Sequence, residues 1–563
     1  MLATREPRVT HSSAVEPYQA AILEQMPRVL SRMDRERYSP TSGCCDRTFW
    51  AWKFTDFPGA RFQEAVCVLS FVYTTEFAGN SYHRNRNLLD WIHMALQYWT
   101  SLQHADGSFD EAYPNERSLA ATAFTAFYVG EALHFLGEDL ASETRNAVHE
   151  TLRRAGGWLV KNDETHGFLS NHLAAASAAL QHIFVLTGDG RCRQRSVYFL
   201  NRVLEHQSAE GWYEEYGGAD FGYQTHGTFY LARLLELDPQ PRLAESLARA
   251  LHFQGLFIHP DRSLGGEYGS RNTQTYYPAA FEMLAASDKA AAWIAQTMRP
   301  AVGGGLAAGV FAVDAYNLFP MLNNLVFALR ACRGPGHAAA VPEEPGKEDS
   351  FLWFASAGIA RFRRNEYVAY VGASKGGVVK LFDRRTGRLV YNDCGYIGQQ
   401  RNGTCVTSQH FDPARPVESE PHELTLASSF VRVSRPVMRP WLFLGFRVFS
   451  LTLGRSAALA RWLKQRLVDV LIYRKKPVGI ELRRTIEFHD RHVTVRDHLG
   501  GAGLANLEEI RWVPSFTTMH MGSSRYFVRH ELDDLGFDAE RSERLDPRRI
   551  SDQPVLTRTI RFD

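Results

Sequence analysis

The chain has 563 residues, several times the usual size of a domain, so at least two domains are expected. Hydrophobic residues make up 45% of the chain and aromatic residues 12%, which is enough to fill sizeable cores. The formal net charge of +2 argues against a dedicated nucleic-acid-binding protein, because such a protein normally carries a dominant basic face.

The N-terminal stretch, residues 1–30, lacks the uninterrupted apolar core of a secretory signal. No run of about 18 apolar residues predicts a membrane-spanning helix. We therefore expect a cytoplasmic protein. The seven cysteines are scattered and show no C-x-x-C spacing, so they predict buried or free thiols rather than a disulfide framework or a zinc site.

The first half of the chain is predicted to be helical. From about Pro17 to Cys332 the apolar residues recur every three or four positions, as in "SLAATAFTAFYVGEALHFLG". Segments beginning at Asp106, Glu210 and Asp261 each pass from an acidic turn, through a polar loop with a tyrosine, into a helix. This weak repeat of roughly 45 to 60 residues predicts stacked helical hairpins. If the hairpins close into a ring, an (α/α) toroid over residues 1–332, their polar loops fall on one rim.

The second half is predicted to be a β-sandwich. Residues 333–350, "RGPGHAAAVPEEPGKEDS", are rich in Gly, Pro and charge and read as a linker. Beyond them, in residues 351–563, the period falls to two in stretches such as "YVAYVGAS" and "HVTVRDHL", separated by turn signals. The expected fold class is therefore α+β and multidomain, with an N-terminal toroid followed by a C-terminal antiparallel β-sandwich.

One toroid helix begins with two polar residues. In "SNHLAAASAALQHIFVL", Asn171 and His172 stand at the start of an otherwise apolar helix, so they either cap that helix or face a cavity. A ring of hairpins encloses a long groove that its loops can line with Tyr, His, Asn, Arg and Glu. Such a groove suits a sugar chain, since aromatic rings stack on sugar faces while amides and guanidinium groups bind hydroxyls and carboxylates.

This arrangement resembles the heparinase II/III-like polysaccharide lyases and their alginate lyase relatives. The resemblance rests on the toroid and sandwich order, on the "SNHLAAASAALQHIFVL" motif, and on a Tyr-rich loop about fifty residues later. It implies that the Asn of such a motif holds the carboxylate of a uronic acid. It further implies that a Tyr removes the C5 proton and passes one to the leaving oxygen, while a His of the β-domain completes the site.

Carried over by position, the resemblance assigns catalytic roles to five residues. Asn171 and His172 become the neutralising pair, Tyr223 in "ADFGYQTHGTF" the base, His226 an accessory acid or base, and His410 in "RNGTCVTSQHFDP" the β-domain His. Tyr216 is the fallback for the base. The residues expected to contact the substrate, an acidic polysaccharide, are Glu116, Arg117, Tyr216, Arg271 and Asn272.

The expected elimination depends on stabilising the negative charge that develops when the C5 proton is removed. Removing the proton next to a carboxylate builds an enediolate, so hydrogen-bond donors placed there stabilise the transition state more than the ground state. A tyrosine, with an ordinary pKa of about 10, is a poor base unless nearby cationic or hydrogen-bonding groups stabilise its phenolate. Elimination by this route needs no metal, and no cofactor is expected.

Other interpretations of the same residues remain open. Asn171 could be a helix cap, His172 a partly buried core residue, Tyr223 a packed loop residue, and the Asn115–Ser118 stretch a simple helix start. The scaffold could equally carry a uronyl C5-epimerase or a non-catalytic glycan-binding assembly protein. A glycoside hydrolase would need facing carboxylates, for which the candidates are Asp110, Glu111, Glu116, Glu214 and Glu215.

A basic insertion interrupts the predicted strands. Residues 435–477 contain many Arg and Lys but a single acid, Asp469, together with Trp and Leu. This composition predicts either a peripheral anchor at the inner membrane surface or a helical cover packed on the sandwich. The anchor would fit an enzyme associated with polysaccharide biosynthesis or export.

Overall fold

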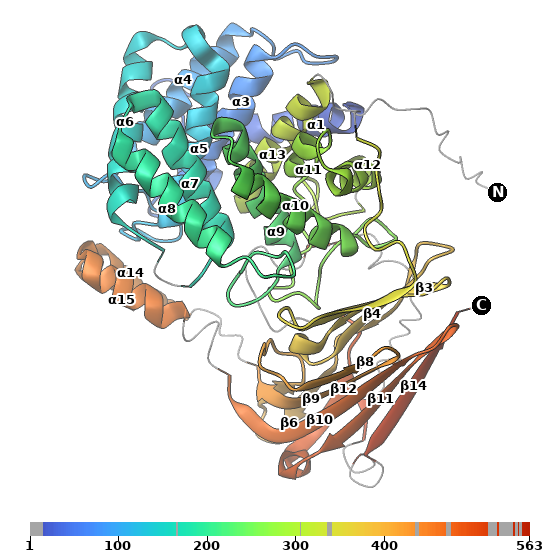
Figure 1. The fold of residues 1–563 in the computed structure, drawn as a ribbon. Coiled ribbons are helices and arrows are strands. Elements are labelled where there is room, and N and C mark those ends of the chain that lie inside the picture. Colours follow the sequence, from blue (N-terminus) through green and yellow to red (C-terminus); the bar gives the residue numbers. More distant parts are fainter. Residues whose placement is uncertain are drawn as a thin grey trace, which may run out of the picture.

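The computed structural model describes residues 15–562, apart from 165–166, 305, 335–339, 434–438, 469–474, 516–525, 528–543, 547–549 and 551–553. Residues 435–438 and 469–474 of the predicted insertion, and part of the predicted linker, therefore lie outside the described residues. A helical domain sits on two stacked β-sheets, and a pair of short helices projects beside them (Figure 1).

Six inner helices form a closed ring. Each packs against the next, and the last returns to the first. Their sequences are apolar nearly all round because both sides of each helix are covered. In chain order they are α3 (Ala65–Thr74), α5 (Leu119–Leu136), α7 (Ser170–Thr187), α9 (Phe221–Leu237), α11 (Ala279–Leu284) and α13 (Ala315–Arg333).

An outer layer of helices completes the hairpins. These helices are amphipathic; the buried residues of the first of them, for example, recur at helical spacing from Leu88 to Trp99. They are α4 (Arg86–Ser101), α6 (Ser142–Lys161), α8 (Gly190–Glu205), α10 (Pro241–Leu256), α12 (Lys289–Gly304) and, from the chain's start, α1 (Glu16–Arg32). The inner and outer rings confirm the predicted (α/α) toroid.

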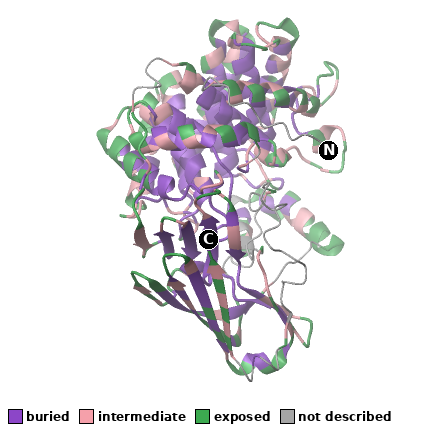
Figure 2. Ribbon diagram, turned by 90° about the vertical axis from the view of Figure 1, so that its right-hand side faces the viewer, coloured by how far each residue is buried: buried purple, intermediate pink, exposed green. Residues whose placement is uncertain are grey.

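One toroid helix is long and apolar enough to cross a membrane. Residues Leu119–Asp139, which include α5, meet the length and composition requirements, but 89% of the apolar window is buried. Figure 2 shows the same burial throughout the interior of the helical domain. This segment is therefore a core helix of the ring.

The polar loops lie on one rim of the toroid, as the repeat predicts. Each loop leads into the N-terminus of an inner helix, and before α5 and α9 the last loop residue caps the helix. The Ser118 side chain accepts the Ala121 N–H, and the Asp220 side chain accepts the Tyr223 N–H. The rim faces the β-domain, since the carboxylate of Glu210 accepts the backbone N–H groups of Ser356 and Ala357.

The sheet next to the rim is covered on both faces. It has five antiparallel strands in sequential order. In its central strand, Val368 and Tyr370 join the toroid core while Ala369 and Val371 face the second sheet. This double burial explains the continuous apolar stretches. The strands are β1 (Ser350–Phe354), β2 (Ile359–Arg363), β3 (Tyr367–Gly372), β4 (Val378–Asp383) and β5 (Leu389–Asp393).

In the described part of the chain the second sheet has nine strands, and one of its faces points outward. Its long strands alternate buried and exposed residues, as β10 shows, so their period of two is clear in the sequence. The two sheets share an apolar core, which confirms the predicted sandwich. The strands are β6 (Tyr396–Gln400), β7 (Cys405–Thr407), β8 (Val417–Glu420), β9 (Glu423–Arg432), β10 (Pro477–Phe488), β11 (His492–Gly500), β12 (Leu507–Trp512), β13 (Arg544–Leu545) and β14 (Val555–Arg561).

The basic insertion contains two helices between β9 and β10. They are α14 (Pro440–Leu451) and α15 (Ala457–Val468), and they lie beside the toroid rim rather than over the sandwich (Figure 1). Asn115 Nδ2 donates to the Ser450 carbonyl at 3.1 Å, and Arg117 Nη1 donates to the Arg455 carbonyl at 2.9 Å. The alternative of a helical cover packed on the sandwich is therefore wrong for these residues.

Candidate active site

The structure decides between the two interpretations of Asn171. Helix α7 begins at Ser170 with Leu169 as its N-cap residue, and no side chain caps it. Asn171 is instead fully buried, and both its backbone N–H and its Nδ2 donate to Glu215 Oε1 at 2.8 Å. The capping interpretation is therefore wrong. Because Asn171 is covered, a substrate could touch its amide directly only if the site opened.

His172 is the more accessible member of the pair. Its Nδ1 lies 2.7 Å from Glu164 Oε2, and its side chain keeps a small exposed face. The ring also makes an edge contact with Phe124, with centroids 5.5 Å apart. A carboxylate on one nitrogen fixes the orientation of an imidazole, so Glu164 holds the His172 ring in one orientation.

Glu215 joins three segments that are distant in the sequence. Besides binding Asn171, its Oε2 pairs with Arg271 Nη1 at 3.3 Å. Burial raises the pKa of Glu215 to about 7, against the opposing effects of Arg271 and of the hydrogen bonds from Asn171. The link between α7 and the 271–273 loop therefore runs through one carboxyl group.

Arg271 lies between the two candidate tyrosines. Its guanidinium carbon is 4.1 Å from the centroid of the Tyr223 ring and 4.8 Å from that of Tyr216. Burial alone would lower its pKa, but Tyr223 and Glu215 raise it, so the group stays charged. A desolvated guanidinium against a phenol ring is a strong cation–π arrangement and stabilises negative charge on the phenol oxygen.

Tyr223 itself is partly exposed in the first turn of α9. The loop that carries Arg271 is tied to this turn by Asp220, whose carboxylate accepts the backbone N–H of Arg271 at 3.1 Å and also binds the Thr273 hydroxyl. The same carboxylate caps α9 through the Tyr223 N–H. One buried acid therefore sets both the tyrosine and the arginine in place.

His226 lies beneath this surface. Its ring stacks on Tyr277 with centroids 4.2 Å apart, and its Nε2 lies 2.9 Å from the Tyr230 hydroxyl. Burial lowers the pKa of His226 well below its usual range, and the charges of Arg61 and His172 act in the same direction. The imidazole is therefore neutral near pH 7. Because it is buried, it supports the site rather than facing it.

Three of the predicted contact residues have strained backbones. One is Arg117 (φ +49°), in the loop before α5, and the other two lie beside Arg271. Tyr216 (φ +54°) and Asn272 (φ +62°) occupy the left-handed region, which is unfavourable for side chains other than glycine. Each such residue costs about 1–3 kcal/mol and is retained where the surrounding structure demands it. Tyr216 and Asn272 flank Arg271, so two of the three strained contact residues lie where these two loops meet.

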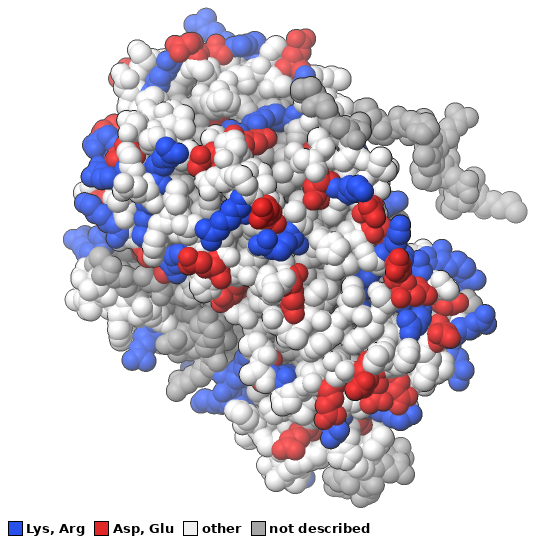
Figure 3. Space-filling model, viewed as in Figure 1, with Lys and Arg blue, Asp and Glu red and all other residues white. Residues whose placement is uncertain are grey.

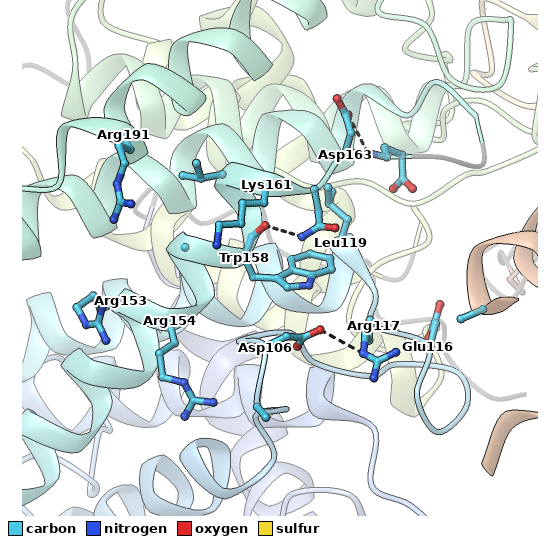
Figure 4. Close-up of a pocket in the computed structure, with 16 residues that line it drawn as sticks. Asp106, Glu116, Arg117, Leu119, Arg153, Arg154, Trp158, Lys161, Asp163 and Arg191 are labelled. Atoms are coloured by element: carbon cyan, nitrogen blue, oxygen red, sulfur yellow. Dashed lines mark hydrogen bonds and ion pairs between the residues drawn. The ribbon is translucent and has the colours of Figure 1, made fainter. Parts of the chain in front are cut away.

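Glu116 and Arg117 line a neighbouring pocket of about 840 Å³ (Figure 4). Arg153, Arg154 and Lys161 project toward it from α6, and Glu164, the partner of His172, also lines it. Glu116 lies in the loop before α5 and accepts the Ala112 N–H at 2.8 Å, so it is not in the first turn of that helix. The pocket therefore borders the His172 side of the site.

His410 belongs to the loop between β7 and β8. Its Nε2 lies 3.0 Å from the Ser429 carbonyl oxygen, to which it can only donate, so Nδ1 carries the free lone pair. Burial, together with Arg415 and Lys475, lowers the pKa of His410 to about 4. The next residue, Phe411, packs against Gly218 beside Tyr216. The loop thus reaches the site, while the hydrogen bonds of the His410 ring are made within the β-domain.

The five carboxylates considered for a hydrolase hold the rim loops together. Each is engaged by neighbouring donors: Asp110 by the N–H groups of Asn115 and Arg117, Glu111 by Arg61, Glu116 by Ala112, Glu214 by His206, and Glu215 by Asn171 and Arg271. These contacts give the acids structural roles.

Sequence reasoning missed several members of the site. Glu164 and Asp220 contact predicted residues, and the charge of Arg61 acts on His226. Asp220 had a usable signal, since an Asp directly before an apolar helix is a typical N-cap. Arg61, whose guanidinium stacks on Phe124 at 4.4 Å, had none because it lies more than a hundred residues from His172 in the chain.

Residues 59–297 match the family described as the ulvan lyase N-terminal domain. Over these residues the toroid is similar to that domain. The matched residues include Asn171, His172, Tyr223, His226 and Arg271, whereas His410 lies outside them. No curated protein sequence matches the chain at a significant level.

Solved structures extend the similarity to the whole chain. The chondroitin AC lyase of Streptomyces coelicolor A3, in complex with chondroitin sulphate, superposes with a TM-score of 0.52 at 12% identity, covering 92% of this chain and 69% of that one. A Paenibacillus xanthan lyase gives 0.51 at 10% identity, covering 89% of this chain and 46% of the xanthan lyase. The predicted toroid–sandwich fold is confirmed, and these comparisons find the chain similar to polysaccharide lyases.

Proposed function

We propose that the protein cleaves a uronic-acid-containing glycan by β-elimination, with Tyr223 as the catalytic base. One observation carries this proposal: three segments predicted separately meet at one point. Arg271 contacts the rings of Tyr223 and Tyr216, and Glu215 joins Arg271 to Asn171. The arrangement places a fixed cation beside an accessible phenol, as proton abstraction by a tyrosine requires.

The donors around the substrate carboxylate would be supplied by the start of α7. His172 has the accessible ring, so we assign it the direct contact with the carboxylate. Asn171 is buried and acts through Glu215 as a positioning residue. Donors that are already oriented stabilise the developing enediolate without reorganising during the reaction.

One residue can carry out both proton transfers, first as a base and then as an acid. Tyr223, as the phenolate, takes the C5 proton, and the electron pair of that C–H bond forms the C4–C5 double bond as the C4–O bond breaks. The phenol then gives its proton to the leaving glycosidic oxygen, which restores the phenolate. Arg271 stabilises that phenolate throughout, because its guanidinium lies against the ring.

An acidic polysaccharide is the substrate class that fits best. The matched family is named for ulvan lyase, and the chondroitin AC lyase with the same fold was solved with chondroitin sulphate. In this chain the pocket beside His172 is lined by Arg117, Arg153, Arg154, Lys161 and Arg191. Guanidinium and ammonium groups suit carboxylate and sulfate groups on the sugars adjoining the reacting one.

The test is to incubate the purified protein with a panel of uronic-acid polysaccharides and follow ultraviolet absorbance of the C4–C5 double bond. Rising absorbance supports elimination. Deuterium uptake at C5 from heavy water without rising absorbance would instead identify an epimerase. New reducing ends without unsaturation would identify a hydrolase, and either result would overturn the proposal.

A further inference from the structure

The two helices of the insertion expose an unusual amount of apolar surface. On α14 the exposed side chains include Trp441, Leu442, Phe443, Leu444 and Val448, and on α15 they include Trp462. Trp441 is 82% and Trp462 51% exposed. Soluble proteins rarely leave a contiguous apolar patch of this kind uncovered unless it binds something.

The charge of the same segment is one-sided. Residues 435–477 contain ten Lys and Arg residues and one acidic residue, in a chain whose overall formal net charge is only +2. Arg439 and Arg466 are exposed beside the apolar side chains. In Figure 3 the described residues at the corner where Figure 1 shows α14 and α15 are mostly uncharged, with basic residues near them.

We propose that α14 and α15 dock on a lipid bilayer surface that carries anionic headgroups. Exposed Trp, Phe and Leu would enter the boundary between headgroups and acyl chains, and the surrounding cations would contact the headgroups. Helices of 12 residues are too short to span a bilayer, so the segment would lie in the plane of the surface.

The docking element is joined directly to the rim of the candidate site. Arg447 pairs with Asp56 at 3.1 Å, and Phe446 makes an edge contact with Tyr113 at 5.1 Å between centroids. Ala460 of α15 lines the pocket that also contains Arg117. Docking on lipid would therefore hold this pocket beside the surface, where it meets glycan chains attached to or leaving the membrane. The lipid contact itself does not depend on the proposed lyase activity.

Vesicle flotation tests the proposal. The full chain is mixed with vesicles of phosphatidylcholine alone or of phosphatidylcholine with phosphatidylglycerol, at low and high salt. We expect flotation with the anionic vesicles that weakens as salt screens the charges. The double variant Trp441→Ala/Trp462→Ala should reduce partitioning by about tenfold or more.

Two further variants test the basic residues apart from the apolar ones and control for the loss of an exposed aromatic side chain elsewhere. Arg439→Gln/Arg466→Gln should reduce binding to anionic vesicles by about twenty-five-fold, since each surface cation contributes roughly fivefold. Tyr38→Ala removes an aromatic side chain outside the insertion that is 98% exposed, and it should leave vesicle binding unchanged. All of the changed side chains are exposed, so the variants are expected to fold.

Two results would overturn the proposal. One is that the wild-type chain floats with neither kind of vesicle. The other is that light scattering without lipid shows a dimer which Trp441→Ala/Trp462→Ala converts to a monomer, because a second copy of the chain would then be what covers the apolar surface.

Discussion

At the scale of single residues, Arg271 contacts two phenol rings that differ in their surroundings. Tyr223 stands in the first turn of a helix, capped through its own N–H by Asp220, whereas Tyr216 sits in a strained loop. A group on a capped helix is held more firmly than one on a loop. This difference favours Tyr223 as the base.

Paired phenol-to-phenyl changes test that choice. Tyr223→Phe should lower kcat by about 10²- to 10⁴-fold with little change in KM, because only the proton-transferring oxygen is lost. Tyr216→Phe keeps the ring against Arg271 and should retain most of the activity. If Tyr216→Phe is inactive and Tyr223→Phe is not, the fallback assignment is the correct one.

Glu215 provides a prediction on pH. Its pKa is about 7 in the folded protein and near 4.5 in the unfolded chain, so the folded state holds the proton more tightly. Its contribution to stability is therefore largest below about pH 4.5 and falls as the pH rises through 7, by up to about 3 kcal/mol.

Urea denaturation from pH 5 to 8 checks this sign. The Glu215→Gln variant removes the titrating group while keeping hydrogen-bonding atoms, so its stability should fall less over that range than the wild type's. A larger fall in the variant than in the wild type would contradict the assignment. Activity of the same variant should drop, since Arg271 loses its carboxylate partner.

At the scale of elements, α9 contains two glycines in different surroundings. A Cβ at Gly222 would lie 2.4 Å from Thr273 Oγ1 and 2.8 Å from Thr273 Cβ, which is too close for real atoms. A Cβ at Gly227 would lie 3.5 Å from Asn171 Cα, an ordinary contact. Gly222 is thus required for the approach of the Arg271 loop to the helix.

The two alanine variants form a matched pair. Gly222→Ala should destabilise the protein by about 1–3 kcal/mol and strongly reduce kcat, because the loop carrying Arg271 is displaced. Gly227→Ala should be neutral or stabilising by up to about 1 kcal/mol, since alanine is the better helix former. Equal losses of activity in both variants would show that the close contact between Gly222 and Thr273 does not determine activity. Thermal unfolding and initial rates measure both effects.

Element prediction succeeded where one pattern decides the structure. The period-two stretch around His492–Gly500 predicts β11, because one face of its sheet is solvated and the other buried. The apolar face of the α14 sequence, by contrast, does not say what it will meet. Its place beside the toroid rim depends on Asn115 and Arg117, more than 300 residues away.

At the scale of the whole molecule, the sheet–toroid contact contains a buried ion pair. Lys380 Nζ of β4 lies 2.8 Å from Glu267 Oε2 of a rim loop, and both side chains are almost fully covered. Removing one partner of such a pair leaves an uncompensated buried charge. The pair therefore links the position of the rim to that of the sandwich.

A buried and an exposed lysine test this link. Lys380→Met should lower the free energy of unfolding by about 3–5 kcal/mol. Lys289→Met, which breaks the exposed pair with Glu343 at 3.2 Å, should cost less than about 1 kcal/mol. Urea midpoints measured side by side compare the two. Equal shifts would mean that the Lys380 pair does not hold the two domains together.

The sequence by itself determined the local architecture of this protein. Hydrophobic periods of 3.6 and 2, the polar loops before each inner helix, and the Asn-His motif are all local signals, so the toroid, the sandwich and the rim position of Asn171, His172 and Tyr223 could be predicted. Tertiary structure alone decided how these residues are connected. Glu215 binds Asn171 and Arg271 across gaps of 44 and 56 residues. A buried carboxyl group pairs with the polar groups that lie near it in space, and the spacing of residues along the chain does not predict which groups these are.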